Sequence, residues 1–155
     1  MGVDVTAGQR VAEAARDAMY ARDRAARALG ITVEEIDPGF ARCRMMVRDD
    51  MLNGHGTCHG GLTFTLADTA FGYACNSYDR ATVALGAQIT FVAPARGGDE
   101  LIATASERSR SGRTGVYDVE VCRADGTLLA LFRGNAYHTR GAVVRAGVAD
   151  GEPGT

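Results

Sequence analysis

Residues 53–76 read NGHGTCHGGLTFTLADTAFGYACN, and this stretch decides the fold. The nine residues 53–61 are too rich in glycine for regular structure, whereas residues 62–75 carry apolar side chains on nearly every face of a helix. A helix that is apolar all round needs to be buried on all sides. The sequence therefore predicts a loop that leads directly into a buried central helix, in which Asp68 is the one charged residue.

The segments on either side predict what covers this helix. Residues 9–29 have the pattern of an amphipathic surface helix that ends at Gly30. Alternating and β-branched residues, separated by turn signals such as Pro38-Gly39 and Asp125-Gly126, predict six strands. These strands cover residues 31–36, 42–47, 82–92, 100–109, 113–123 and 127–138.

The order of the elements predicts an α+β fold. Consecutive strands with short turns pair as an antiparallel sheet, and such a sheet buries its apolar face by wrapping around the single central helix. Residues 1–140 then form one domain, and the Gly- and Ala-rich residues 141–155 form a flexible tail. A sheet of this kind has open edges, so we expect edge-to-edge pairing with a second copy, at least a homodimer.

Composition excludes several classes of protein. The chain has 155 residues, the length of one domain. Its formal charge of -2 lacks the excess of positive charge that binding to duplex nucleic acid or an anionic membrane needs. It has neither an apolar run long enough to span a membrane nor an apolar signal core, which predicts a cytoplasmic protein. Its four cysteines form no CxxC pair, so disulfides and a zinc ribbon are not expected.

The presence of the charged residue Asp68 in an otherwise apolar helix needs an explanation. A buried carboxylate costs several kcal/mol unless it is paired or hydrogen-bonded, so a functional role is one explanation. The alternative is structural: Asp68 faces a wet groove or accepts a hydrogen bond from a neighbouring backbone group.

Gly60-Gly61 opens the helix. The free N–H groups of a helix start point outward with a partial positive charge, and glycines let a substrate carbonyl come close to them, as in an oxyanion-binding site. The alternative is a tight turn that needs a positive φ. Gly60 and Asp68 are eight residues apart, or about 12 Å along a helix axis. Both can act on one carbonyl only if a second copy brings its Asp68 to Gly60, which predicts a site shared across a dimer interface.

Two other kinds of chemistry are less favoured for the loop. His55, Cys58 and His59 lack the repeated ligand spacing of a zinc site, so no metal is expected. Cys58 and His59 are adjacent, which is a poor arrangement for a nucleophile and its base. His59 is better explained as a residue that orients the loop through a backbone hydrogen bond.

The loop and helix closely resemble those of the hotdog-fold acyl-CoA thioesterases, specifically the phenylacetate-degradation type. The resemblance covers most of the chain except the tail and the details of the first helix. It rests on residues 53–61, 66–71, 73–77, 89–91, Pro94, 113–118 and 130–134.

The resemblance implies a hotdog fold that hydrolyses an acyl-CoA thioester without a cofactor, because coenzyme A is part of the substrate. It implies that Asp68 is the nucleophile or the base for water, that the Gly60 N–H is the oxyanion donor, and that Asn53 positions the water or the thioester. His59 belongs to the same catalytic loop. Some relatives carry a hydroxyl-bearing residue in the strand that follows the helix, where this chain has the apolar residues Ala84 and Leu85. A contribution from such a hydroxyl is therefore in doubt here.

The same resemblance assigns residues to the path of the substrate's CoA moiety, although an ordinary solvated strand end is the alternative for Arg113. These residues are Gly61, Thr69, Gly86, Ala87, Arg113, Thr114 and Gly115.

The expected substrates are arylacetyl-CoA esters, phenylacetyl-CoA or ring-hydroxylated relatives, because Phe71 and Tyr73 could form a compact apolar acyl pocket. The expected assembly is a homodimer with shared sites that pairs into a homotetramer. Two alternatives stand beside the thioesterase. A non-catalytic acyl-CoA-binding protein would bind thioesters without turnover, and an acyl dehydratase would need a general-base His and an acid, which His59 alone does not supply.

Overall fold

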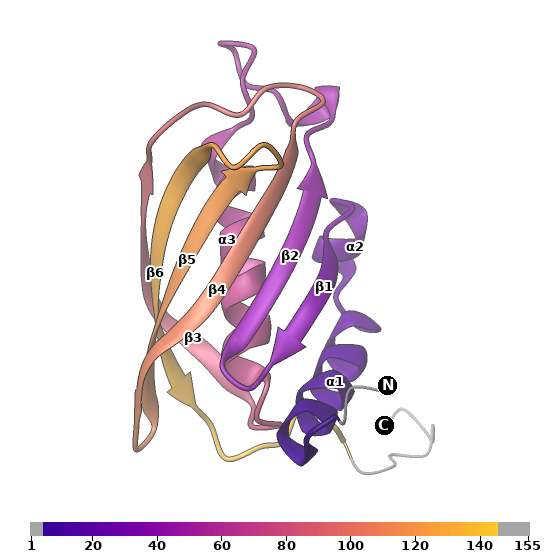
Figure 1. The fold of residues 1–155 in the computed structure, drawn as a ribbon, viewed down its shortest axis with the longest axis vertical. Helices are drawn as coiled ribbons and strands as arrows, with labels where there is room; N and C mark the ends of the chain where they lie inside the picture. The colour runs from indigo at the N-terminus through magenta and orange to yellow at the C-terminus, as the bar shows by residue number, and fades with distance from the viewer. Residues whose placement is uncertain (1–4, 146–155) are drawn as a thin grey trace, which may run out of the picture.

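The computed structural model describes residues 5–145, and Figure 1 shows one curved sheet around one helix. The helices in these residues are α1 (Ala7–Tyr20), α2 (Arg24–Ala28), the short 3-10 helix η1 (Asp49–Met51) and α3 (Gly60–Asn76). The strands are β1 (Thr32–Asp37), β2 (Phe40–Met46), β3 (Thr82–Phe91), β4 (Glu100–Ser111), β5 (Thr114–Arg123) and β6 (Leu128–His138). No helix in this part of the chain is both long and apolar enough to cross a membrane.

The strands form a single antiparallel sheet in the order β1-β2-β4-β5-β6-β3. Strand β3 follows α3 in the sequence but pairs with β6, so it lies at one edge of the sheet and β1 at the other (Figure 1). The predicted order of the six strands and the central helix is confirmed, and so is the antiparallel pairing.

The concave face of the sheet packs on α3 and forms the core. On β5, Tyr117, Val119 and Val121 are buried, whereas Asp118 and Glu120 lie on the opposite face, as their alternation predicts. The helix comes very close to the sheet at Gly134 of β6, where an added Cβ atom would lie 2.8 Å from the Phe71 ring. Only glycine leaves room for this ring, so Gly134 fixes where α3 lies against the sheet.

The central helix is not covered on every side within one chain, which corrects the expectation of complete burial. Its open side carries Gly61, which is exposed, and Thr65, Asp68 and Gly72, which are half-buried. These residues recur at intervals of three and four, so they share one face of the helix. That face is where a second copy would have to supply the missing cover.

The predicted single helix over residues 9–29 is wrong, because the helix ends at Tyr20 and restarts at Arg24. The reason for the break is Asp23. Its carboxylate caps α2 by accepting a hydrogen bond from the Ala26 N–H at 3.0 Å, and it also accepts one from the hydroxyl of Tyr73 on α3 at 3.1 Å. A continuous helix could not present Asp23 to both partners.

The predicted flexible tail begins at residue 141, but its first residues are held in place. Asp79 accepts hydrogen bonds from the N–H groups of Val143 and Val144 at 3.0 and 2.7 Å, and Arg22 donates to the Val143 carbonyl at 3.2 Å. Val143 is buried. Residues 141–145 therefore pack on the domain, and the rest of the predicted tail lies outside the described residues.

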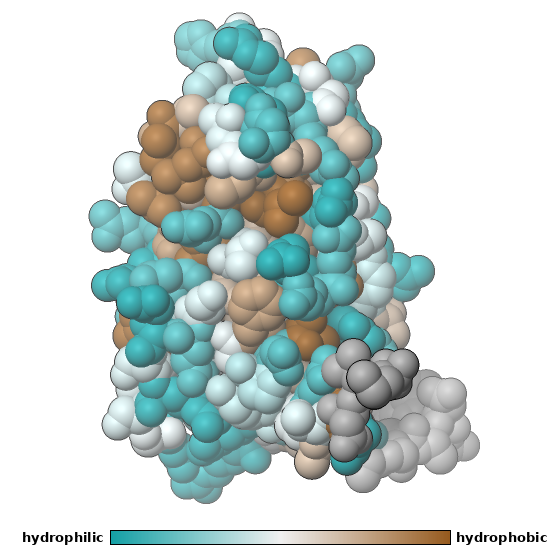
Figure 2. Space-filling model, viewed as in Figure 1, coloured by the Kyte–Doolittle hydropathy of each residue, from teal (hydrophilic) through white to brown (hydrophobic). Residues whose placement is uncertain are grey.

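Apolar side chains are exposed along the β3 edge. Val83, Leu85, Phe91 and Val92 are each more than half exposed, and Leu131 of the neighbouring strand β6 is 43% exposed. Figure 2 shows apolar surface gathered at the upper left of the view, over the β3 and β6 side of the sheet. An exposed apolar edge strand is a ready surface for pairing with another chain.

Asp23→Ala tests the link between the N-terminal helices and the core. The substitution removes the α2 cap and leaves the buried Tyr73 hydroxyl without an acceptor, so we expect the free energy of unfolding to fall by about 2 kcal/mol in urea denaturation. The control is Arg27→Ala, whose exposed side chain makes a long bond of 3.4 Å to the Ala21 carbonyl, with an expected change below about 0.5 kcal/mol. Equal effects of the two substitutions would show that Asp23 has no linking role.

Candidate active site

The glycine-rich loop has a defined turn that ends where α3 begins. Asn53 donates its backbone N–H to the Thr57 carbonyl at 2.8 Å, and Gly56 takes the positive φ of 74° that this turn requires. Gly60 and Gly61 have no positive φ, since both belong to the helix. The tight-turn explanation for this glycine pair is therefore wrong, and close approach to the helix start remains.

Not every backbone N–H group in the first turn of α3 has a hydrogen-bond acceptor. His59 is the N-cap residue, and its Nδ1 accepts a hydrogen bond from the Gly61 N–H at 3.3 Å. Its carbonyl accepts from Leu62 and Thr63 at 2.9 and 3.3 Å. The Gly60 N–H has no acceptor among residues 5–145. His59 thus orients the helix start, as expected, and leaves Gly60 as the free donor.

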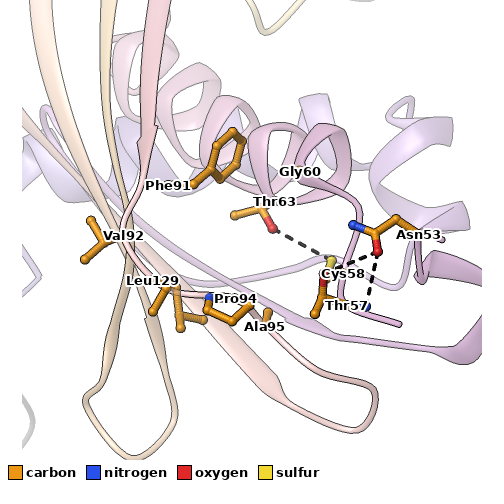
Figure 3. A pocket seen from close by; sticks show the side chains of 11 residues that line it. Asn53, Thr57, Cys58, Gly60, Thr63, Phe91, Val92, Pro94, Ala95 and Leu129 are labelled. Carbon is orange, nitrogen blue, oxygen red and sulfur yellow. Dashed lines mark hydrogen bonds between the residues drawn. The ribbon is translucent and has the colours of Figure 1, made fainter. Parts of the chain in front are cut away.

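Asn53 presents its amide nitrogen to the same place. Its Oδ1 accepts hydrogen bonds from the N–H of His55 at 2.9 Å and from the N–H and hydroxyl of Thr57, both at 3.3 Å. Backbone N–H groups can only donate, so the atom they meet is the oxygen, and Nδ2 occupies the other position. Figure 3 shows this nitrogen turned toward the Gly60 side of the loop. Asn53 is therefore a donor in this site.

Asn53 and Gly60 line one pocket of about 380 Å³ between the start of α3 and the segment that follows β3 (Figure 3). The expectation that Phe71 and Tyr73 form the acyl pocket is wrong, because both are buried in the core beneath the sheet. The residues that line the pocket are Asn53, Thr57, Cys58, Gly60, Thr63, Phe91, Val92, Ala93, Pro94, Ala95 and Leu129.

Phe91 packs directly on the helix start. A Cβ atom added to Gly60 would lie 2.9 Å from Cζ of the Phe91 ring, although Phe91 as a residue is 54% exposed. The ring and the free amide therefore form adjacent parts of one surface, and Figure 3 shows the ring beside the first turn of α3. Gly60 is required here for close approach, both by the ring and by any group that reaches its N–H.

Asp68 does not line this pocket. It lies about 12 Å further along the helix axis, on the open side of α3, where it is half-buried. Its carboxylate has no hydrogen-bond or ion-pair partner among the described residues, which speaks against the structural explanation through a backbone donor. Burial raises the pKa of Asp68 above the ordinary value of a carboxyl. A carboxylate with a raised pKa and no partner is suited to taking up a proton or to attack.

The cysteine of the loop is held in a protonated form, and the loop side chains are not gathered as a cluster. Burial raises the pKa of the Cys58 thiol, so little of it is thiolate at neutral pH. Its Sγ accepts a weak hydrogen bond of 3.7 Å from the Thr63 hydroxyl. Across residues 5–145, no three His, Cys, Asp or Glu side chains gather as metal ligands would.

The structure does not bring the predicted CoA-path residues to the pocket of the same chain. Gly61 lies at the start of α3 beside His59, and the Thr69 hydroxyl donates to the Thr65 carbonyl at 2.7 Å. Gly86 and Ala87 are exposed on the edge strand β3.

Arg113, Thr114 and Gly115 lie at the start of β5, whose Thr114 pairs with Tyr137 near the end of β6. Arg113 and Thr114 are exposed, and Gly115 is buried against the Tyr117 ring. They lie at the end of the sheet opposite to Gly60, where Tyr137 of β6 pairs with Thr114 on one side and with Val83 of β3 on the other.

Sequence reasoning missed Thr63, Val92 and Leu129 as parts of the pocket. Thr63 follows Gly60 by three residues, so helical spacing alone could have placed it on the same side. Val92 and Leu129 reach the pocket through the pairing of β3 with β6, in which the Val92 N–H donates to the Leu129 carbonyl at 2.8 Å. No local signal in the sequence gives that register.

The comparisons with known proteins show the family to which the chain belongs. Residues 55–130 match the Thioesterase superfamily. The chain is 48% identical over 126 residues to acyl-coenzyme A thioesterase PaaI of Escherichia coli K12, a match that covers 81% of this chain and 90% of the relative. The chain belongs to the thioesterase superfamily.

Solved structures place this thioesterase within the hotdog fold. The PaaI protein from the phenylacetic acid degradation operon of Escherichia coli superimposes with a TM-score of 0.85 at 47% identity, over 86% of this chain and 96% of that one. A Streptococcus mutans protein solved with bound acetyl-CoA gives a TM-score of 0.69 at 26% identity, over 72% of this chain and 90% of that one. The predicted family, the hotdog fold and the class of thioester hydrolase are confirmed.

Gly60→Ala tests the contact between the helix start and Phe91. The added methyl group keeps the N–H but displaces the ring, so we expect thioester turnover to fall about tenfold with little change in the melting temperature. Adding Phe91→Leu should recover part of the loss, with Phe91→Leu alone as the control. A double variant no faster than Gly60→Ala would show that this contact does not limit access.

Asp68→Asn tests the energetic cost of the buried carboxylate. Because the pKa of Asp68 is raised in the folded state, its cost to stability is absent below the ordinary value of about 3.9, grows as pH rises toward the folded-state pKa, and is complete above it. We expect the substitution to stabilise the fold at pH 7 by about 0.5–1 kcal/mol, because the carboxylate is only half-buried, and by nothing at about pH 3. Urea denaturation at both pH values, with exposed Asp17→Asn as the control, measures this. A wild type as stable as the variant at pH 7 would contradict it.

Proposed function

We propose that this thioesterase hydrolyses arylacetyl-type CoA esters, phenylacetyl-CoA or ring-hydroxylated relatives, to the free acid and CoA. The observation that carries the proposal is that one pocket is lined by two donors without an acceptor among residues 5–145, the Gly60 N–H and the Asn53 Nδ2. A thioester carbonyl oxygen that binds both donors is polarised, and its developing negative charge is stabilised in the transition state.

The carboxylate of Asp68 completes the reaction. It either removes a proton from water as the water oxygen bonds to the carbonyl carbon, or attacks that carbon itself to form an anhydride that water then hydrolyses. In both routes the carbon–sulfur bond breaks, the CoA thiolate leaves and takes up a proton, and the acid is released. Its raised pKa makes Asp68 a stronger base than an ordinary aspartate.

The pocket supports a compact acyl group. Its volume of about 380 Å³ suits a single ring, and its wall is apolar at Phe91, Val92, Pro94 and Leu129. The Escherichia coli relative comes from the phenylacetic acid degradation operon, which supports an arylacetyl substrate for this chain as well. The polar pair Cys58 and Thr63 gives the wall one place that can meet a ring hydroxyl.

A homodimer is needed to assemble the site. Gly60 and Asp68 are about 12 Å apart on one helix, so the partner's carboxylate must act on this chain's carbonyl. In an antiparallel pair of α3 helices this happens when the two-fold axis passes at the level of Phe64, midway between the two residues. The exposed edge of β3 supports such pairing, and the homotetramer remains the expected assembly of two dimers.

The same pairing suggests how the CoA moiety is bound. Antiparallel contact along β3 brings the partner's Thr82 end toward this chain's Phe91 end, and Arg113 and Thr114 lie near that end of the sheet. The partner's exposed Arg113 and Thr114 are then available to the CoA phosphates, with Gly86 and Ala87 along the path. Acetyl-CoA is bound in the Streptococcus mutans structure.

Mixed oligomers test the activity and the shared site together. Free-thiol release from a panel of CoA esters, led by phenylacetyl-CoA, should collapse at least about a hundredfold in Asn53→Ala and in Asp68→Asn. Co-expressing the two inactive chains should restore about a quarter of the wild-type rate, because half the dimers are mixed and each mixed dimer has one intact site.

The outcomes separate the alternatives. Thioester binding without turnover by the wild type would favour the non-catalytic acyl-CoA-binding protein. Turnover that survives Asp68→Asn would overturn the role of the carboxylate. Two inactive chains that stay inactive when mixed would show that both groups act within one chain.

A further inference from the structure

We propose that Thr57 is a positioning residue for catalysis, whose hydroxyl holds and polarises the Asn53 amide so that Nδ2 acts as an oxyanion donor. This inference rests on the proposed function, because it concerns the same site. Thr57 has no part in the motif chemistry assigned above, yet it supplies two of the three hydrogen bonds to the Asn53 Oδ1.

Thr57 is itself held rigidly. Its carbonyl accepts the Asn53 N–H at 2.8 Å, and it forms a β-bridge with Arg96 in the segment between β3 and β4. The next residue, Cys58, donates its N–H to the Ala95 carbonyl at 2.8 Å. The loop is thus fixed at Thr57 and Cys58, and the Thr57 side chain, half-buried in the pocket wall, has a fixed place from which to donate.

The other two hydrogen bonds to Asn53 show that the Thr57 hydroxyl is the donor in its own. The two backbone N–H groups identify the Asn53 atom as Oδ1, an acceptor, so the Thr57 hydroxyl must be the donor at 3.3 Å. With three donors on one oxygen, Oδ1 has no capacity left to accept from water or substrate. Asn53 is therefore a donor only, and its two orientations are not interchangeable.

Saturating the oxygen also changes the nitrogen. Hydrogen bonds to an amide oxygen draw electron density from the nitrogen, so the N–H groups become better donors when the oxygen is bonded. This gain matters most when negative charge develops on the thioester oxygen, in the transition state rather than in the bound substrate. Loss of the hydroxyl should therefore lower kcat and leave KM nearly unchanged.

Thr57→Val removes the hydroxyl and keeps the β-branched shape, and Thr57→Ser restores the hydroxyl. We expect kcat for free-thiol release to fall about tenfold in Thr57→Val, with KM within about twofold, and to recover in Thr57→Ser. Thr57→Val in the Asn53→Ala background should have no further effect, because a residue that acts through Asn53 has nothing left to position. Matched melting temperatures verify that each variant is folded.

Other results overturn the inference in identifiable ways. Equal turnover of Thr57→Val and wild type would show that the two backbone donors suffice. A tenfold loss that persists in the Asn53→Ala background, or that appears in KM, would show a general structural role or direct substrate contact. A wild type that turns over no CoA ester would instead overturn the proposed function, and the inference would fall with it.

Discussion

The position of the central helix depends on one close contact, the Phe71 ring against Gly134 of β6. A single Cβ atom at residue 134 would lie 2.8 Å from that ring, so the helix can reach the sheet only over a glycine. Phe71 also packs on Tyr117 and Phe132, with ring centroids 5.6 and 5.8 Å apart. Because cores of this kind are close-packed, these contacts fix both the rotation of α3 and its position along its axis.

That fixed position decides which groups are available for chemistry. It puts the start of α3 beside Phe91 and the pocket, and it turns Asp68 to the side that the sheet does not cover. The Gly60 N–H and the Asp68 carboxylate are both left without partners among the described residues, and each costs stability in the folded chain. Unsatisfied polar groups that a fold tolerates in this way are typical of functional sites, where stability is given up for reactivity.

The buried helix, its start and the half-buried strand β5 could be predicted from the sequence, because each shows either a regular pattern or a clear departure from one. Asp68 interrupts an apolar helix, Gly60 lies where an ordinary helix former would serve, and the alternation through Tyr117 and Val121 marks a half-buried strand. The break at Asp23 could not be predicted, since the Ala-rich sequence favours one continuous helix and the hydrogen bond that Asp23 accepts from Tyr73 on α3 is a tertiary contact.

The pocket wall was beyond prediction for a similar reason. Val92 and Leu129 meet through the register of β3 on β6, which depends on a bulge between Ala84 and Gly86. The orientation of the Asn53 amide depends on three donors whose directions only the folded loop defines. Sequence patterns identify which residues are unusual, whereas their pairing is a property of the tertiary structure.

The proposed division of the site between two chains rests on the stiffness of α3. A helix cannot bend enough to bring together two residues about 12 Å apart along its axis, so no motion of one chain unites the donors with the carboxylate. In the proposed dimer, the interface that buries the apolar β3 edge also creates the active site, so a change that weakens the interface should also lower the activity. On this proposal, a chain whose edge strand stays unpaired keeps a folded pocket and both donors but has no carboxylate within reach of the thioester.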